Sequence, residues 1–427
     1  MTSAATVPTG ASDRSPEALP VHACRLCGTP LRHTFVDLGM SPPCESFLEA
    51  SRLDEMEPYY PLRVMVCDGC FLVQLREYVA PDRIFTDYAY FSSFSTTWVA
   101  HAKAYCEMIA RRLGLGAQSL VVELASNDGY LLQHFLGCGL DILGIEPAAN
   151  VAQAAVARGV PSLVRFFGSD VARELVRQGR ARLVIANNVL AHVPALNDFI
   201  AGIKILLAPE GTATIKFHHL LCLIQKCQFD NIYHEHFQYL SLDAARFAFA
   251  RHGLAVVDVE RKPSQGGSLR VYVQHEDTAP PTVSPRVAEV LAEEGAAGLR
   301  DVGVGQAFSR RMLEMKLGLL SFLVKARQDG KSVVCYGAAA KGNTLLNYSG
   351  IHADLVDYAV DRSPHKQGHF LPGSRIPIHH PDKVLVTRPD YVLILPWNIR
   401  DEIIADMSCI REWGGRFVVP VPALEVI

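Results

Sequence analysis

Short apolar runs alternate with amphipathic stretches along most of the chain. Residues 98–113 have helical periodicity, and they lead into residues 119–124, an almost wholly apolar run typical of a buried strand. Similar runs follow at 140–145, 181–186 and 211–217. Apolar strands separated by helical segments predict an α/β domain built on a parallel sheet, with a helix beginning near Tyr130.

The carboxyl-terminal part repeats this pattern. Residues 277–310 combine a proline-rich stretch with a polar helix, which marks a boundary between domains. A helical segment at 306–330 then precedes an apolar strand at 332–337 and small residues at 338–342. We expect a second Rossmann-like unit, in which Lys341 at the helix start could meet a diphosphate. Close packing of the helix on its strand is the alternative explanation of the small residues.

Composition restricts the class of protein. Hydrophobic residues make up 49% of the 427 positions and charged residues 20%, which suits packed globular cores. The formal net charge of −3 gives no electrostatic case for binding nucleic acid, and no apolar run reaches the ~20 residues of a membrane span. Residues 1–21 lack the pattern of a signal peptide and are expected to form a disordered tail, so we expect a cytoplasmic protein.

The eleven cysteines include two Cys-x-x-Cys pairs, Cys24 with Cys27 and Cys67 with Cys70. Two such turns supply the four thiolates that Zn²⁺ prefers, and a closed four-thiolate site is structural rather than catalytic. A redox dithiol would lack the βαβ context that it needs. A nucleic-acid-binding ribbon is disfavoured because acidic residues are frequent between the pairs. We predict one structural zinc ion.

The first strand of the central unit ends in a small-residue turn, residues 125–129, and the next strand ends in Glu146 and Pro147. This order is typical of a nucleoside site, in which the turn approaches the ligand and the acid binds the ribose hydroxyls. Asp128 would repel a pyrophosphate but suits the cationic S-adenosylmethionine, so methyl transfer is favoured over hydride transfer. A solvated acid at the strand end is the alternative for Glu146.

Proton-handling groups gather in the segment 231–237, where Tyr233, Glu235 and His236 occupy four positions. If the reacting carbon lies beside a ketone, a histidine is the natural base and a carboxylate can fix its tautomer. Tyr233 or His192 could then hold the enolate oxygen. His192 follows the third strand, near the expected cleft, although a lone histidine is more often structural. Metal binding by residues 234–236 is less suitable because they are neighbours, not an i, i+4 pair.

Aromatic and hydroxyl side chains are dense at 87–98. Tyr88, Tyr90, Ser92 and Ser93 are candidates for a lid that contacts a polar ligand. A linker that packs on the next domain is the alternative. Near the carboxyl terminus, Arg362 and Lys366 are possible anion contacts, and a solvated basic loop is the alternative there.

Several motifs together carry a resemblance to a known family. They are the paired cysteines, Tyr88-Ala-Tyr-Phe-Ser-Ser93, Glu123-Leu-Ala-Ser-Asn-Asp-Gly-Tyr130, Gly144-Ile-Glu-Pro147, Asn188-Val-Leu-Ala-His192, Ile232-Tyr-His-Glu-His236, Gly266-Gly-Ser-Leu-Arg270 and Tyr336-Gly-Ala-Ala-Ala-Lys-Gly342. From residue 22 onward, the chain resembles the sugar C-methyltransferases that act on nucleotide-linked 4-keto deoxysugars in antibiotic biosynthesis.

The resemblance implies a zinc-binding domain at 22–80, a Rossmann-like S-adenosylmethionine domain at 81–275 and a Rossmann-like sugar-nucleotide domain at 276–427. It implies that His236 is the general base at C3 of the sugar. Around the reacting centre it places Tyr233, Glu235, His192 and one of Tyr88 and Tyr90.

Two sets of binding residues follow from the same resemblance. Those expected to bind the cofactor are Glu123, Ala125, Asn127, Asp128, Gly129, Tyr130, Glu146, Pro147, Asn187 and Asn188. Those expected to bind the substrate are Ser92, Ser93, Gly267, Ser268, Arg270, Lys341, Asn343, Arg362 and Lys366.

The expected reaction is transfer of a methyl group from S-adenosylmethionine to C3 of a dTDP-linked 4-keto deoxysugar through an enolate. We expect a monomer without a nucleic-acid or membrane partner. An O- or N-methyltransferase of the same architecture and a non-catalytic sugar-nucleotide-binding protein are the alternatives.

Three places depart from the family's usual pattern. Gln265 stands where histidine is common, Cys44 where asparagine is more usual, and Lys-Phe-His at 216–218 replaces an acidic Glu-x-Pro. We expect these substitutions to bear on the sugar pocket and not on the base.

Overall fold

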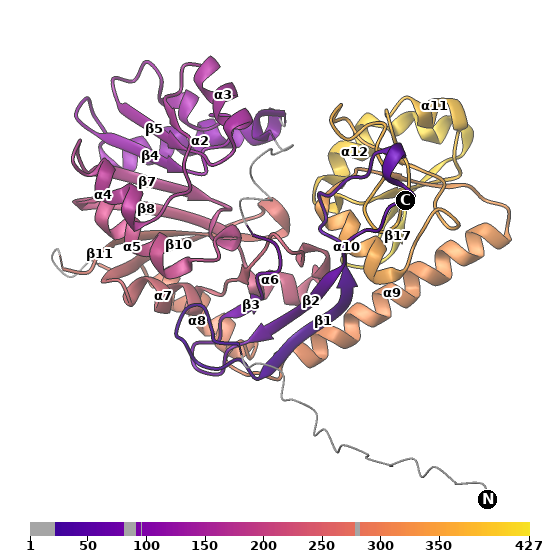
Figure 1. Cartoon of the computed structure of the whole chain (residues 1–427), viewed down its shortest axis with the longest axis horizontal. Helices are drawn as coiled ribbons and strands as arrows, with labels where there is room; N and C mark the ends of the chain where they lie inside the picture. The colour runs from indigo at the N-terminus through magenta and orange to yellow at the C-terminus, as the bar shows by residue number, and fades with distance from the viewer. Residues whose placement is uncertain (1–21, 81–90, 95, 278–281) are drawn as a thin grey trace, which may run out of the picture.

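The computed structural model describes residues 22–80, 91–94, 96–277 and 282–427. Two α/β lobes lie side by side, and a small antiparallel sheet and the long helix α9 run beneath them (Figure 1). The expected tail at 1–21 and the candidates Tyr88 and Tyr90 lie outside the described residues. Within these ranges, none of the helices combines the length and apolarity needed to cross a membrane.

The central sheet has seven strands in the order β10-β11-β8-β7-β4-β5-β6. The five strands from β6 to β8 are parallel, and β11 and β10 are added antiparallel at one edge. The strands are β4 (Leu120–Leu124), β5 (Asp141–Ile145), β6 (Ser162–Leu163), β7 (Ala181–Asn187), β8 (Leu207–His218), β10 (Leu254–Lys262) and β11 (Ser268–His275). The predicted parallel sheet is confirmed, because runs such as that of β4 are covered on both faces and buried.

Helices surround this sheet. They are α2 (Thr96–Leu113), α3 (Ala149–Ala157), α4 (Ser169–Leu175), α5 (Leu196–Leu206), α6 (Leu220–Gln225), α7 (Leu242–Ala250) and α8 (Pro285–Ala296). The helix expected from Tyr130 is instead one 3₁₀ turn, η3 (Leu132–Phe135). Gly137 and Gly139, both at positive φ, end it after one turn because helical residues require negative φ.

The carboxyl-terminal lobe is a second Rossmann-like unit, as predicted. Its sheet has the order β14-β13-β12-β15-β16-β17, with only β17 antiparallel among the described strands. The strands are β12 (Val333–Tyr336), β13 (Ala359–Val360), β14 (Ile378–His379), β15 (Tyr391–Ile394), β16 (Arg416–Val419) and β17 (Glu425–Val426). The helices are α9 (Val304–Gln328), α10 (Ala340–Ser349), α11 (Lys383–Thr387) and α12 (Arg400–Asp406).

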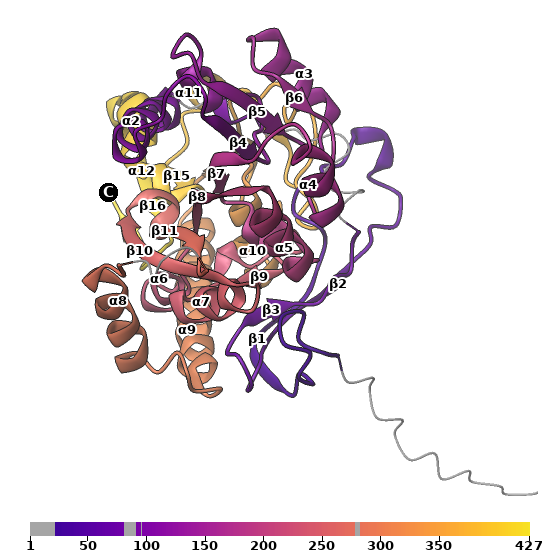
Figure 2. The same ribbon diagram turned by 90° about the vertical axis from the view of Figure 1, so that its left-hand side faces the viewer.

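The amino-terminal sheet joins the two lobes. Its order is β1 (His33–Ser41), β2 (Tyr60–Val66), β3 (Val73–Leu75) and β9 (Gln238–Tyr239), so its last strand comes from the chain just after the reactive cluster (Figure 2). β1 packs on α9, and the ring centroids of Phe35 and Phe308 lie 5.6 Å apart at this contact. Gly305 of α9 lies so close to the carbonyl oxygen of Phe35 that no side chain would fit at this position. Phe35 and Phe308 belong to one hydrophobic core, which the amino-terminal sheet shares with the carboxyl-terminal lobe.

Candidate active site

A cavity of about 1900 Å³ opens between the two lobes. Residues at the carboxyl ends of the central strands line one side, among them Glu146 and Asn187. Residues after β12, among them Gly337 and Lys341, line the other. Carboxyl ends of parallel strands are where open α/β sheets bind ligands, so one cavity serves both Rossmann-like units.

The turn after β4 has the backbone shape of a ligand-binding turn. Ala125 and Asn127 both have positive φ, near 50°, which turns their backbone away from the strand direction. The Glu146 carboxylate accepts hydrogen bonds from the backbone N–H of Asn127 (2.9 Å) and of Ala148 (3.0 Å). Glu146 is therefore held at the cavity wall rather than left solvated, and burial raises its pKa.

Most of the expected cofactor residues reach this wall. Ala125, Asn127, Tyr130, Glu146, Pro147, Asn187 and Asn188 line the cavity. Glu123, Asp128 and Gly129 are not among the described lining residues. Glu123 is buried in β4, where burial, together with the charge of Glu146, raises its pKa well above the usual range.

The electrostatic reason given for Asp128 needs correction. Its carboxylate has no exposed surface and pairs with Arg158 at 2.8 Å. It also accepts hydrogen bonds from the backbone N–H and the hydroxyl of Ser93. Because Arg158 compensates this charge, Asp128 acts more weakly on a sulfonium or a pyrophosphate than the sequence suggested. Its position shows a structural role: it ties the turn to α3 and to the segment before α2.

The reactive cluster lines the cavity through Tyr233, Glu235 and His236. The ring centroids of Tyr233 and His236 are 3.9 Å apart, and those of His192 and His236 are 4.7 Å apart. Nδ1 of His236 lies 2.7 Å from the carbonyl oxygen of Asn231. A carbonyl can only accept, so Nδ1 carries the hydrogen and Nε2 keeps its lone pair. Burial and the nearby His192 lower the pKa of His236 well below its usual value, which keeps the ring neutral.

The sequence suggested that a carboxylate would fix the histidine tautomer, and the structure corrects this. The Asn231 carbonyl takes that position, and Glu235 instead accepts a hydrogen bond from the Cys44 thiol, at 3.4 Å. Burial, reinforced by the charge of Glu45, raises the pKa of Glu235 to about 8. Glu235 lines the cavity, and its raised pKa favours the neutral acid, which can donate a hydrogen bond as well as accept one.

The expected substrate residues divide into two groups. Ser92, Lys341, Arg362 and Lys366 line the cavity. The others are used within the protein: Ser93 bonds Asp128, Asn343 donates to the Cys44 carbonyl, and Arg270 stacks 4.1 Å from the Tyr105 ring centroid. Gly267 and Ser268 lie behind the wall, where Gly267 meets the side chain of Cys222.

The three departures from the family pattern lie at or next to this site. Gln265, held at a positive φ of 59°, and His218 both line the cavity, and Cys44 contacts Glu235. Lys216 is buried below α2, 4.4 Å from the Trp98 ring centroid, and burial lowers its pKa to about 7. The substitutions therefore alter the cavity wall, and His218 and Cys44 also lie close enough to act on His236 and Glu235.

Two polar groups in this region escaped the sequence-based prediction. Asp230, fully buried, accepts a hydrogen bond from the Trp397 indole at 2.5 Å, and burial raises its pKa to about 6. Burial lowers the pKa of Lys341, and the charge of Asp230 partly opposes this shift. Gln228 accepts a hydrogen bond from His218 at 2.7 Å and donates to the Gly266 carbonyl at 2.9 Å. The only available signal was their closeness in sequence to the reactive cluster.

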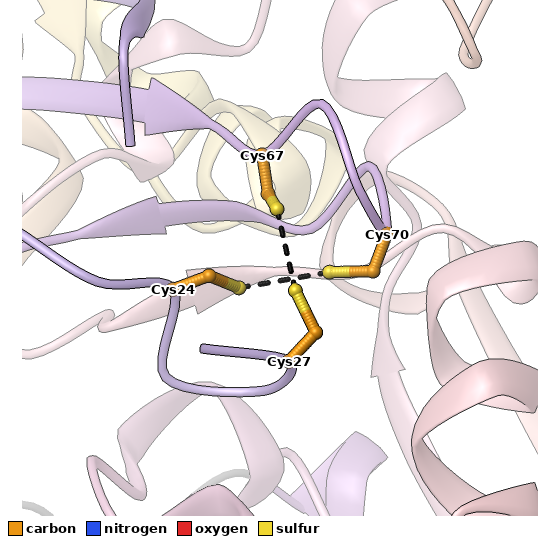
Figure 3. Close-up of side chains that lie close together, drawn as sticks. All are labelled: Cys24, Cys27, Cys67 and Cys70. Atoms are coloured by element: carbon orange, nitrogen blue, oxygen red, sulfur yellow. Dashed lines mark hydrogen bonds between the residues drawn. The ribbon is translucent and has the colours of Figure 1, made fainter. Parts of the chain in front are cut away.

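The four predicted cysteines converge in space (Figure 3). Sγ of Cys24 lies 3.6 Å from that of Cys70, and Sγ of Cys27 lies 3.5 Å from that of Cys67. A tetrahedron with Zn–S bonds of about 2.3 Å has edges of about 3.8 Å, so the set fits zinc. The side-chain amide of Gln74 donates a hydrogen bond to Sγ of Cys24. Hydrogen bonds of this kind orient the ligands of a metal ion. This is a structural zinc site.

Comparison with known proteins agrees with this architecture. Residues 24–85 match a family model for a zinc binding domain, residues 98–259 one for a methyltransferase domain, and residues 263–422 one for a C-methyltransferase C-terminal domain. Fold, cavity and matches define an S-adenosylmethionine-dependent methyltransferase with one structural zinc. The C-methyltransferase NovU from Streptomyces niveus is 36% identical over 409 residues, which cover 96% of this chain and 97% of that protein. The chain therefore belongs to the C-methyltransferase family.

Two solved structures are similar to part of the chain. An S-adenosylmethionine-dependent methyltransferase from Clostridium acetobutylicum is 8% identical, covers 40% of this chain and 90% of its own, and has a TM-score of 0.34. Magnesium protoporphyrin IX methyltransferase from Synechocystis is 16% identical, covers 41% of this chain and 84% of its own, and has a TM-score of 0.32.

Proposed function

We propose that the protein transfers a methyl group from S-adenosylmethionine to C3 of a dTDP-linked 4-keto deoxysugar, in the biosynthesis of an antibiotic or related natural product. The observation that carries the proposal is the hydrogen bond from Nδ1 of His236 to the Asn231 carbonyl. It leaves Nε2 as a free lone pair at the wall of a cavity shared by both lobes. A buried neutral imidazole in this orientation can accept a proton from carbon.

The cavity residues have distinct proposed roles. S-adenosylmethionine supplies an electrophilic methyl group when it is bound beside Asn127 and Glu146. His236 removes the C3 proton. Tyr233 and His192, whose rings both contact the ring of His236, hold the developing enolate oxygen. Glu235 lines the same cavity, and in the neutral form that its raised pKa favours it donates a hydrogen bond to a sugar oxygen.

We propose that the carboxyl-terminal lobe holds the nucleotide part of the substrate. Lys341 lies in the first turn of α10 at the cavity wall, 3.3 Å from the side-chain oxygen of Asn398. A diphosphate at this position would meet a cation at the start of a helix. Arg362 pairs with Asp406 and Lys366 lies 3.6 Å from Glu45, so both are more strongly engaged within the protein.

The decisive experiment is solvent deuterium exchange at C3, measured by mass spectrometry on a panel of dTDP-linked 4-keto sugars without methyl donor. Only carbon methylation passes through an enolate, so exchange separates it from O- or N-methylation. His236→Ala should lower exchange and methyl transfer by about 10²–10⁴-fold, the usual contribution of a general base. S-adenosylmethionine affinity should stay nearly unchanged in a calorimeter.

A matched control is His352→Ala, because His352 is exposed and outside the cavity-lining set. Substantial exchange in His236→Ala would show that another group is the base. Methylation without exchange in the native protein would favour an O- or N-methyltransferase. Failure of the native protein to bind S-adenosylmethionine would favour the non-catalytic alternative.

A further inference from the structure

A second cluster of reactive side chains lies behind the cavity wall. Sγ of Cys222 lies 3.9 Å from Nδ1 of His219, and Nε2 of His219 lies 2.7 Å from Oε1 of Glu294. Cys222 is in α6, His219 immediately precedes that helix, and Glu294 comes from α8, 75 residues along the chain from His219. A thiol, an imidazole and a carboxylate in this order have the arrangement of an activated nucleophile, its base and the group that orients the base.

The carboxylate of this cluster is firmly held. The Glu294 side chain is 2% exposed, and its two oxygens accept hydrogen bonds from the backbone N–H of Leu242 (2.5 Å) and of Asp243 (3.0 Å). An oxygen in this position accepts the Nε2 hydrogen of His219, which directs Nδ1 toward the sulfur. Burial opposes protonation of His219, but its hydrogen bonds with Cys222 and Glu294 raise its pKa.

The thiol stands in a positive environment. Burial opposes its ionisation, but His219, followed by the charges of Lys226 and Arg261, lowers the pKa of Cys222. Arg261 also pairs with Glu293 at 2.6 Å, which reduces its share of this effect. Cys222 is partly exposed, whereas Cys227 five residues on is buried with a raised pKa. A thiolate next to an imidazolium with access to solvent is the environment of reactive cysteines.

We propose that Cys222, His219 and Glu294 form a reversible thiol-modification site that takes low-molecular-weight disulfides. The Cys222 thiolate attacks one sulfur of the disulfide, a new S–S bond forms, and the old S–S bond breaks. The leaving thiolate takes a proton from solvent. The Cys222 sulfur is thereby oxidised and one sulfur of the reagent is reduced, so the disulfide itself is the oxidant.

The site is mechanically linked to the cavity. A Cβ built on Gly267 would lie 2.6 Å from Sγ of Cys222, so the sulfur packs directly on that backbone. The turn before Gly267 is η6 (Ser264–Gly266), and Ser264 and Gln265 line the cavity. On the side of Gly267 this contact leaves no room for an added group, so a group that enters there would displace the turn. Modification is therefore expected to lower methyl transfer.

The first test compares two cysteines within one molecule and needs no variant. Zinc-loaded full-length protein is alkylated with iodoacetamide at pH 7, and labelling is followed by peptide mass spectrometry. Cys222 should react at least about fivefold faster than Cys138, an exposed cysteine away from the cluster, because thiolate reactivity follows a lowered pKa. His219→Gln should slow Cys222 by a similar factor and move its pH profile upward, with Cys138 unchanged. Equal rates at the two cysteines, or a Cys222 rate unchanged by His219→Gln, would overturn the activation.

The second test addresses the link to the cavity. Treatment with the disulfide of 2-mercaptoethanol should place one adduct on Cys222, accelerate hydrogen exchange at residues 264–268 and lower methyl transfer, and a reductant should reverse all three. Cys222→Ser should keep the exchange pattern and the activity of the untreated protein in the presence of the reagent. An adduct on Cys222 that changes neither exchange nor activity would refute the link. The exchange measurement is independent of which sugar the enzyme methylates.

Discussion

The buried ion pair between Asp128 and Arg158 gives a sharp prediction about the cofactor turn. The Asp128 side chain has no exposed surface, and the Arg158 side chain is 35% exposed, at a distance of 2.8 Å. Arg158→Met keeps much of the aliphatic packing but removes the only cation that the structure pairs with Asp128 among the described residues. The turn that holds Asn127 at the cavity should then open more easily.

The magnitude follows from the exposure of the two partners. Removing one member of a fully buried pair costs about 3–5 kcal/mol because the other charge stays buried and uncompensated. Arg158 is about one-third exposed, and Ser93 continues to donate to Asp128, so both effects reduce this figure. We expect a loss of about 2–3 kcal/mol in the free energy of local opening.

Native-state hydrogen exchange measures that free energy at the hydrogen-bonded amides of the turn, those of Ser126, Asn127 and Gly129, and calorimetry measures S-adenosylmethionine affinity. Asp128→Asn should restore more than half of the loss when combined with Arg158→Met, since no buried charge remains. Arg173→Met is the matched control, because its pair with Asp170 is exposed and worth at most about 1 kcal/mol. A loss below about 0.5 kcal/mol for Arg158→Met, or no rescue by Asp128→Asn, would refute the reasoning.

Three further predictions concern other parts of the molecule. Gly305→Ala should lower the denaturant midpoint by the equivalent of about 1–3 kcal/mol, because the new methyl group overlaps β1. Gly318→Ala, on the same helix, places its methyl group in open space and should raise the midpoint by the equivalent of up to about 1 kcal/mol. Equal effects of the two substitutions would contradict the packing of α9 on β1. The folded pKa of Glu235 is raised to about 8, so the stability that Glu235 contributes is lost as pH rises toward 8. The melting temperature of Glu235→Gln, relative to that of the native protein, should therefore climb from about pH 4.3 to pH 8 and then level. A difference in melting temperature that stays constant with pH would argue against a neutral acid. Lys341→Met should raise KM for the sugar nucleotide about tenfold or more and leave S-adenosylmethionine affinity unchanged. The control Lys331→Met, at an exposed lysine, should leave KM as it is. A KM unchanged by Lys341→Met would exclude Lys341 as the diphosphate contact.

Local sequence patterns predicted the features that depend on neighbouring residues. The apolar runs that became β4, β5 and β7 carry their burial in their own composition, and the Cys-x-x-Cys spacing fixes each half of the zinc site. The position of Glu146 after a strand likewise placed it at the cavity wall.

Interactions between distant segments could not be predicted in this way. Arg158 reads as an ordinary surface cation at the end of α3, and nothing near it indicates the carboxylate 30 residues earlier that it neutralises. Cys44 contacts Glu235 across 191 residues. A hydrophobic pattern shows which side chains are buried, but the partner of a polar side chain depends on tertiary packing.

The two-residue strand β9 has a consequence for protein engineering. It begins two residues after His236 and pairs with β3, and the amide of Leu75 donates a hydrogen bond to the carbonyl of the intervening Phe237 at 2.9 Å. The zinc-binding segment therefore acts as the template against which the segment that follows His236 is aligned. Chimeras that exchange amino-terminal domains between relatives should transfer residues 73–75 and 231–239 from the same parent. A hybrid that splits this pair would keep Tyr233, Glu235 and His236 and still hold the proposed base out of register.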